Sequence, residues 1–164
     1  MAQTTAAMSG TELDVEVSSN GSTWTNISGT TQAVETPEGT LASGEVYTGD
    51  GASAIITSGK FEPVEVKVII VYTNESNEAF ETIRPWYTAR TPIYVRWSPK
   101  GIGTSGAPVF TTTDAEGTLQ ACPIIAFDYP GGDASEAAPV MASFTVKAPF
   151  ITRTVSGSST GLGS

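Results

Sequence analysis

The sequence has 164 residues, a mass of 17.0 kDa and a formal net charge of −9, a length that suits one domain. Only 15% of the residues are charged, whereas glycine (17) and proline (10) are frequent. This composition excludes a helical bundle and favours short strands joined by turns. Histidine is absent and Cys122 is the one cysteine, which excludes Ser-His-Asp and Cys-His nucleophiles, histidine-ligated zinc and an internal disulfide.

The first expected element is a half-buried strand over residues 11–17, because apolar and acidic residues alternate there. Its apolar side carries Leu13, Val15 and Val17, and its polar side carries Glu12, Asp14 and Glu16. The Asn20-Gly21 pair predicts a hairpin turn. A return strand over 22–27 follows, with Trp24 as its expected buried anchor.

Short strands are expected next at 31–36 and 41–48. A polar, glycine-rich stretch then separates the second of these from 54–56; it consists of Thr48, Gly49, Asp50, Gly51, Ala52 and Ser53. Residues 63–73 give the strongest strand signal, with one continuous apolar face. The opposite face is polar at Glu65 and apolar further along, so we expect a helix or a neighbouring subunit to cover its apolar end.

One segment is expected to be helical. Residues 73–76 offer N-cap side chains, and apolar residues then recur at helical spacing. We expect Phe80, Ile83 and Trp86 to form the packing face of this helix. Pro85 interrupts the pattern and should kink or end the helix nearby.

Further strands are expected at 93–98, 108–112, 119–127, 140–146 and 150–155. The fold class is therefore mainly β: a β-sandwich or partly open barrel flanked by one short helix. We expect a single domain over 11–155, a flexible N-terminal arm over 1–10 and a flexible Ser/Gly-rich tail over 156–164. No signal peptide or membrane span is expected, which suggests a soluble protein kept in the cytoplasm.

Charge is distributed unevenly. Residues 1–59 contain seven acidic side chains and no basic one, and the first base is Lys60. An acidic surface repels phosphate and argues against stable nucleic-acid binding. The alternative explanation of the acidity is solubility alone. Carboxylate pairs are the one catalytic option left, and alternating acids on a strand usually face solvent. We expect no catalytic, metal or cofactor site, and therefore assembly or binding.

Several segments together resemble a known family. They are the hairpin with Trp24 followed by 27–29, the segments 44–47 and 59–63 running into strand 64–73, the single helix, and 93–101. In this order they resemble the tail tube proteins, or major tail proteins, of long-tailed, siphovirus-like bacteriophages. The resemblance covers roughly residues 10–155.

The resemblance implies six copies in a ring, with one sheet of each copy contributing to a continuous inner β-barrel. Rings would stack into a hollow tube that conducts double-stranded genomic DNA, assembled in the host cytoplasm as part of the virion tail. Tape measure protein and tail terminator are the partners it implies. Because the lumens of this family are typically acidic, Glu12, Asp14, Glu16 and Glu65 become candidates for the lumen. Residues 48–53 become the candidate loop for ring stacking.

Two alternatives remain open. A non-enzymatic binding module, an adhesin or carbohydrate-binding domain, would present aromatic rings, for which Trp86, Tyr87 and Tyr94 are available. A tail terminator or a capsid decoration protein would share the fold but form a single ring or a trimer without polymerising.

Overall fold

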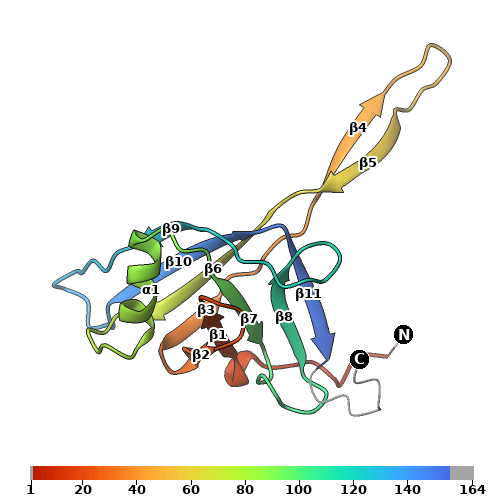
Figure 1. Ribbon diagram of the computed structural model, residues 1–164. Helices are drawn as coiled ribbons and strands as arrows, with labels where there is room; N and C mark the ends of the chain where they lie inside the picture. Colours follow the sequence, from red (N-terminus) through yellow and green to blue (C-terminus); the bar gives the residue numbers. More distant parts are fainter. Residues whose placement is uncertain (1, 156–164) are drawn as a thin grey trace.

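The computed structural model describes residues 2–155, and within them it contains eleven strands and one α-helix (Figure 1). The helix is α1 (Ala79–Thr88), and two short 3-10 turns are η1 (Gly10–Glu12) and η2 (Ser28–Thr30). The strands are β1 (Asp14–Ser18), β2 (Thr25–Asn26), β3 (Thr31–Val34), β4 (Leu41–Val46), β5 (Ile55–Phe61), β6 (Val64–Val71), β7 (Tyr94–Ser98), β8 (Pro108–Thr113), β9 (Ile124–Asp128), β10 (Met141–Ala148) and β11 (Phe150–Val155).

Two open antiparallel sheets form the body. One has five strands in the order β11-β8-β7-β1-β2, and the other has four in the order β3-β6-β10-β9. The longest pairing joins β6 to β10 over eight residue pairs, from Val64 opposite Ala148 to Val71 opposite Met141. The expected mainly β fold with one helix is confirmed, and its sheets are open rather than closed into a barrel.

The core lies between the two sheets and contains alternate side chains from each. The even-numbered residues of β6 and their partners on β10 are buried, and so are the odd-numbered Val15 and Val17 of β1 and Val95 and Trp97 of β7. The largest fully buried side chains include Phe144, Ile70, Ile83, Ile93, Val15, Val17 and Val95. Period-two alternation therefore locates the core correctly on these four strands.

Helix α1 closes the sandwich beside β9 (Figure 1). Phe80 lies 5.3 Å from Phe127 and 4.8 Å from Tyr72 between ring centroids, and Tyr87 stacks on Phe127 at 5.2 Å. Phe80 and Ile83 are buried, and Trp86 is half-buried against the same core. The helix thus contributes an aromatic cluster that covers one side of the sandwich.

The start of the helix differs from the prediction. Its N-cap is Glu78, which accepts a hydrogen bond from the hydroxyl of Thr73, so residues 73–76 do not cap it. Pro85 is accommodated inside the helix, which ends three residues later at Thr88. The proline ring removes one backbone donor on an exposed face, where its cost is smallest.

Two expectations for the N-terminal region are wrong. Glu12 belongs to η1, because the hydroxyl of Ser9 accepts from the N–H of Thr11 and starts a 3-10 turn; β1 begins only at Asp14. Trp24 is half-buried outside the core, and β2 is limited to two residues. The hairpin turn at Asn20-Gly21 does form: Gly21 has φ +78°, and Asn20 accepts the N–H groups of Ser22 and Thr23.

The remaining two strands, β4 and β5, form a separate two-stranded sheet that projects far from the body (Figure 1). We call residues 41–61 the hairpin arm. Strand β5 extends to Phe61, so residues 57–61 form a strand that was not predicted. Among the described residues, no helix is long and apolar enough to cross a membrane.

Residues 2–9 are exposed and lie outside regular secondary structure. The expected C-terminal tail, 156–164, lies outside the described residues. The expected division of the chain into an arm, a domain and a tail stays a prediction.

This core leads to a stability prediction. Replacing the fully buried Phe144 with alanine should lower the free energy of unfolding by about 3–5 kcal/mol, because it leaves a cavity between the sheets. Tyr47→Ala, on the exposed arm, is the control and should change that free energy by less than about 0.5 kcal/mol. Urea unfolding of the unassembled chain measures both. Equal effects of the two changes would contradict this placement of the core.

Candidate functional site

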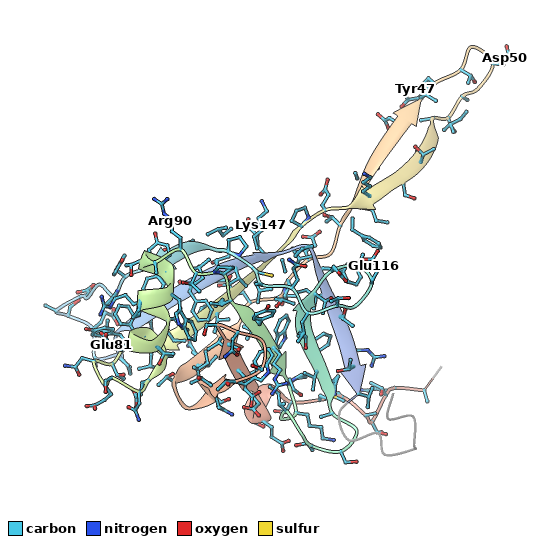
Figure 2. All side chains as sticks on the ribbon, in the orientation of Figure 1. Tyr47, Asp50, Glu81, Arg90, Glu116 and Lys147 are labelled. Atoms are coloured by element: carbon cyan, nitrogen blue, oxygen red, sulfur yellow. The ribbon has the colours of Figure 1, made fainter. Side chains whose placement is uncertain are left out.

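The hairpin arm is exposed along nearly its whole length. Every residue of β5 is exposed, and so is every residue of β4 except Ala42. Figure 2 shows Tyr47 and Asp50 at its outer end, away from the body. Its exposed large apolar side chains are Leu41, Val46, Tyr47, Ile55, Ile56 and Phe61. The arm therefore presents apolar surface that the subunit itself does not cover.

The arm is anchored at its root. The hydroxyl of Thr40 donates to Glu62 at 2.8 Å, and the N–H of Glu62 donates to the carbonyl of Thr40 at 2.9 Å. The ring of Phe61 packs edge-on against Phe150 of β11 at 5.0 Å. These contacts fix the direction in which the arm leaves the body.

A groove of about 590 Å³ opens at this root, and we call it the root groove. Its apolar walls come from the arm root, from β6 and from the inner side of the five-stranded sheet. They are Leu41, Phe61, Val64, Trp97, Phe110, Phe150 and Ile151. Arg153 and Glu62 are its charged members. The groove is thus an opening into the sandwich core that the subunit leaves accessible to solvent.

The outer face of the four-stranded sheet carries a polar depression near the arm root. Four carboxylates line it, together with two lysines; the residues are Glu35, Glu38, Glu62, Glu65, Lys67 and Lys147. Further along, Lys67 lies 3.9 Å from Asp128. Four acids against two bases leave this depression with a net charge of −2.

The outer face of the five-stranded sheet carries a different arrangement. Nε of Arg96 donates to Glu16 at 2.6 Å, and the guanidinium lies 4.1 Å from the ring centroid of Trp24. Tyr94 meets Trp24 edge-on at 6.5 Å. A side chain at Gly21 would meet the Tyr94 ring at 3.2 Å. This surface is consolidated by its own contacts, which explains why Trp24 is half-buried without entering the core.

Asp14 holds three segments together. It accepts hydrogen bonds from Asn26 at 2.7 Å, from the Ser28 hydroxyl, and from the N–H of Ile102 at 3.0 Å. Partial burial raises the pKa of this carboxyl, but hydrogen bonds from Ser28, Asn26 and Ile102 outweigh it, so the net pKa lies below the ordinary 3.8. Asp14 therefore acts as a structural carboxylate between β1, β2 and the loop after β7.

The structure does not bring the four lumen candidates together. Asp14 and Glu16 lie on the outer face of the five-stranded sheet, Glu12 lies on η1, and Glu65 lies on the other sheet beside Lys147. Residues 48–53 form the outer end of the hairpin arm. Glu35, Glu38 and Glu62 lie in the same depression as Glu65 but were not among the predicted site residues. The sequence feature that could have indicated them is their position directly beside the segments that form the arm.

The aromatic residues considered for a binding module are also separated. Trp86 and Tyr87 belong to α1, and Tyr87 stacks on Phe127, whereas Tyr94 lies with Trp24 on the five-stranded sheet. Trp86, Tyr87 and Tyr94 therefore form no common platform. In the described part of the chain, no three His, Cys, Asp or Glu side chains gather where they could hold a metal ion.

Comparison with solved structures identifies the fold. A chain of the six-fold-symmetrised baseplate of the anti-feeding prophage matches with a TM-score of 0.69 and 10% identity, covering 96% of this chain and 99% of that one. A chain of the PVC sheath/tube terminator, from an extracellular contractile injection system, matches with a TM-score of 0.65 and 11% identity, over 94% and 98%. A chain of the tail of an empty gene transfer agent particle matches with a TM-score of 0.63 and 11% identity, covering 90% of this chain and 99% of that one.

The chain has a tail-tube-like fold. The resemblance to tail tube proteins is confirmed at this level, and the restriction to long-tailed phages stays a prediction. The similar chains come from tails and tail-like injection systems, and some come from tube-terminating structures. No protein-family model matches the chain, and the search of curated proteins found no match.

The Asp14 contacts lead to a pH prediction. Because the folded state lowers the pKa of Asp14, its stabilising contribution is complete above the ordinary value of 3.8 and is lost as pH falls through the folded pKa. Asp14→Asn should lower the free energy of unfolding at pH 7 by about 1 kcal/mol. The further loss of stability of this variant between about pH 4 and about pH 2 should be smaller than that of the wild type.

Urea unfolding at a series of pH values measures this effect. Glu12→Gln is the control, since the Glu12 side chain makes no hydrogen bond within residues 2–155, and its profile should follow the wild type. Identical acid profiles for Asp14→Asn and the wild type would contradict a structural role of the Asp14 carboxylate.

Proposed function

We propose that this chain is a non-enzymatic structural subunit that assembles as hexameric rings stacked into a hollow tail tube. The observation that carries the proposal is the hairpin arm: an exposed apolar extension on a tail-tube-like body. An isolated two-stranded hairpin is marginally stable in water. An arm of this kind is maintained most readily where a neighbouring subunit packs against it.

Ring formation would use the four-stranded sheet. Its edge strands, β3 and β9, have no further strand partner among residues 2–155, and pairing them with those of neighbouring copies in a ring would remove exposed edges. Its outer face would then line the lumen. The half-buried apolar side chains Ile69 and Val71 lie on that face too, and crowding of neighbouring copies around a ring would shield them from solvent.

Glu65 would contribute to the charge of the lumen, together with Glu35 and Glu38. A wall of this sign repels DNA phosphates, so DNA would pass without adhering; the repulsion extends over about 8–10 Å at physiological salt. Asp14 and Glu16 are engaged in contacts within the subunit, which makes them weaker candidates for this role. Tape measure protein inside the tube and a terminator at its end are the partners we propose, in a virion tail assembled in the host cytoplasm.

A tail terminator is the second candidate function, because chains from tube-terminating structures share the fold. A terminator would form one ring and would not polymerise. Negative-stain electron microscopy of the purified protein over a concentration series separates the two. Long hollow tubes with six-fold end views would support a tube subunit, and single rings would support a terminator.

The arm leads to an assembly prediction. Replacing residues 47–54 with a two-residue Asn-Gly turn would close the hairpin directly after the Val46–Ile55 pair. We expect this arm-trimmed variant to keep the thermal unfolding midpoint of the wild type, since the removed residues are largely exposed. We also expect rings at most and no tubes by electron microscopy. Tubes of wild-type length would contradict a stacking role for the arm.

The outer face of the four-stranded sheet leads to a second prediction. Tubes of the triple variant Glu35→Lys, Glu38→Lys and Glu65→Lys should retain short duplex DNA on sedimentation at low salt and release it as salt rises. The control triple changes the exposed Glu75, Glu116 and Glu136 to lysine, with the same change in net charge. Equal DNA retention by both triples would contradict a lumen position for Glu35, Glu38 and Glu65.

A further inference from the structure

We propose that the root groove of one copy binds the outer end of the hairpin arm of a second copy. This inference rests on the proposed function and adds the acceptor surface for the arm. The arm end is defined here as residues 45–56. The contact would bury the apolar side chains of the arm end in the open mouth of a neighbouring sandwich.

The root groove is suited to an apolar occupant. Trp97 and Phe110 stack at 5.7 Å on one wall, and Phe61 packs against Phe150 at 5.0 Å at the rim. On the opposite side of the body α1 and its aromatic cluster close the sandwich, but no element of the described chain closes the groove. Apolar walls of this kind gain free energy when a neighbour displaces water from them.

The arm end offers side chains of the matching type. Val46, Tyr47, Ile55 and Ile56 are 56%, 68%, 53% and 71% exposed, respectively. Val46 and its partner Ile55 share one face of the arm, and Ile56, which is paired with Glu45, lies on the other face. Aromatic and aliphatic anchors inserted in a pocket are the usual centre of a protein interface.

The arm end cannot fill the groove of its own chain. Leu41 and Phe61, at the arm root, already line that groove. Val46 lies five residues further along an extended strand, which places it about 17 Å away at roughly 3.3 Å per residue. The occupant must therefore come from another copy.

Charge supports the same pairing. Residues 41–59 contain two acids, Glu45 and Asp50, and no base. Arg153 lines the groove, is exposed, and has no ion pair among residues 2–155. The carboxylate in the groove, Glu62, already accepts a hydrogen bond from Thr40. An acidic arm end therefore meets an unpaired guanidinium.

The arrangement also gives assembly a direction. Arm end and groove are different surfaces of one chain, so the contact is heterologous and each bound copy leaves a new arm end and a new groove available. Contacts of this type generate closed rings or open stacks, depending on the rotation between copies. A symmetric dimer would require a self-complementary patch instead.

Cross-linking tests the contact directly. The double variant Thr48→Cys/Thr36→Cys places one thiol on the arm end and one on the groove lining, and keeps Tyr47 and Arg153. Cys122 is fully buried, and burial raises its pKa, so it should stay unreactive. Treatment of the assembled protein with a short bis-maleimide should give a ladder of bands one subunit apart on denaturing gels.

The matched control is Thr48→Cys/Ala137→Cys, in which the second thiol lies on an exposed loop outside the groove. We expect no ladder from it or from either single variant. Assembled protein that gives no ladder from the 48/36 pair, or a ladder from the 48/137 pair instead, would overturn the inference. A ladder from the 48/36 pair that ends at one ring and one that continues beyond it both support the groove as acceptor.

Charge exchange provides an independent readout. Arg153→Glu should raise the critical concentration for assembly by about fivefold, the upper range for one exposed ion pair. Adding Glu45→Lys and Asp50→Lys should restore it, whereas Lys100→Glu, an equal charge change elsewhere, should have little effect. Failure of the reversed pair to restore assembly would contradict the Arg153 contact.

The two proposals can fail separately. If the arm-trimmed variant loses tubes but the 48/36 pair gives no ladder, the tube function stands and the acceptor groove is wrong. If the wild type stays monomeric at every concentration and the 48/36 pair gives no ladder, both are wrong.

Discussion

The structure depends on one constraint: the subunit has more apolar surface than its own core can bury. The two sheets enclose a well-packed interior in which Phe144 and Ile70 are fully buried. The same chain leaves Tyr47 and Ile56 on the arm in contact with water, and it leaves the walls of the root groove open. Scattered apolar side chains are normal on protein surfaces, but a concentrated set on a projecting hairpin indicates an interaction surface.

The position of α1 shows that the two sides of the sandwich are covered differently. Beside β9 the helix supplies Phe80 and Ile83, and the sandwich is covered there. At the arm root no second helix performs the same task within residues 2–155. The sandwich is therefore covered on one side and incomplete on the other. Such a design would suit the proposed tube subunit, because other copies would then supply the surface that covers the open side.

Much of the body could be predicted from the sequence, for a physical reason. Period-two alternation arises where one face of a strand is buried, so β1, β6, β7 and β10 were recognisable. The arm has no buried face, and Thr57-Ser58-Gly59-Lys60-Phe61 gives no alternation to detect. The sequence therefore does not predict residues 57–61 of β5, although it places the loop 48–53 between two β segments.

Side-chain partners were harder to predict than strands. Alternation correctly placed Asp14 and Glu16 on a polar face, but it could not reveal that Arg96, eighty residues away, binds Glu16. The sequence predicts Trp24 to be the buried anchor of its strand, whereas the Arg96 guanidinium provides a stacking partner for it at the surface. The four lumen candidates lie on different elements in the structure. The sequence does not reveal this, because alternation identifies a polar face but does not tell which sheet that face belongs to.

Charge repulsion and apolar contact act on different surfaces of the subunit. Glu16 of β1 is paired with Arg96 and Asp14 accepts hydrogen bonds from neutral groups, whereas the arm end carries two acids without a base and the depression on the outer face of the four-stranded sheet has a net charge of −2. In the proposed ring, copies around a shared lumen would bring those outer faces together, and their repulsion would oppose assembly until salt screens it. Apolar docking acts over contact distance and is not weakened by such screening. A subunit built in this way can combine a lumen that repels phosphate with stable stacking, because the two demands fall on different surfaces and different forces.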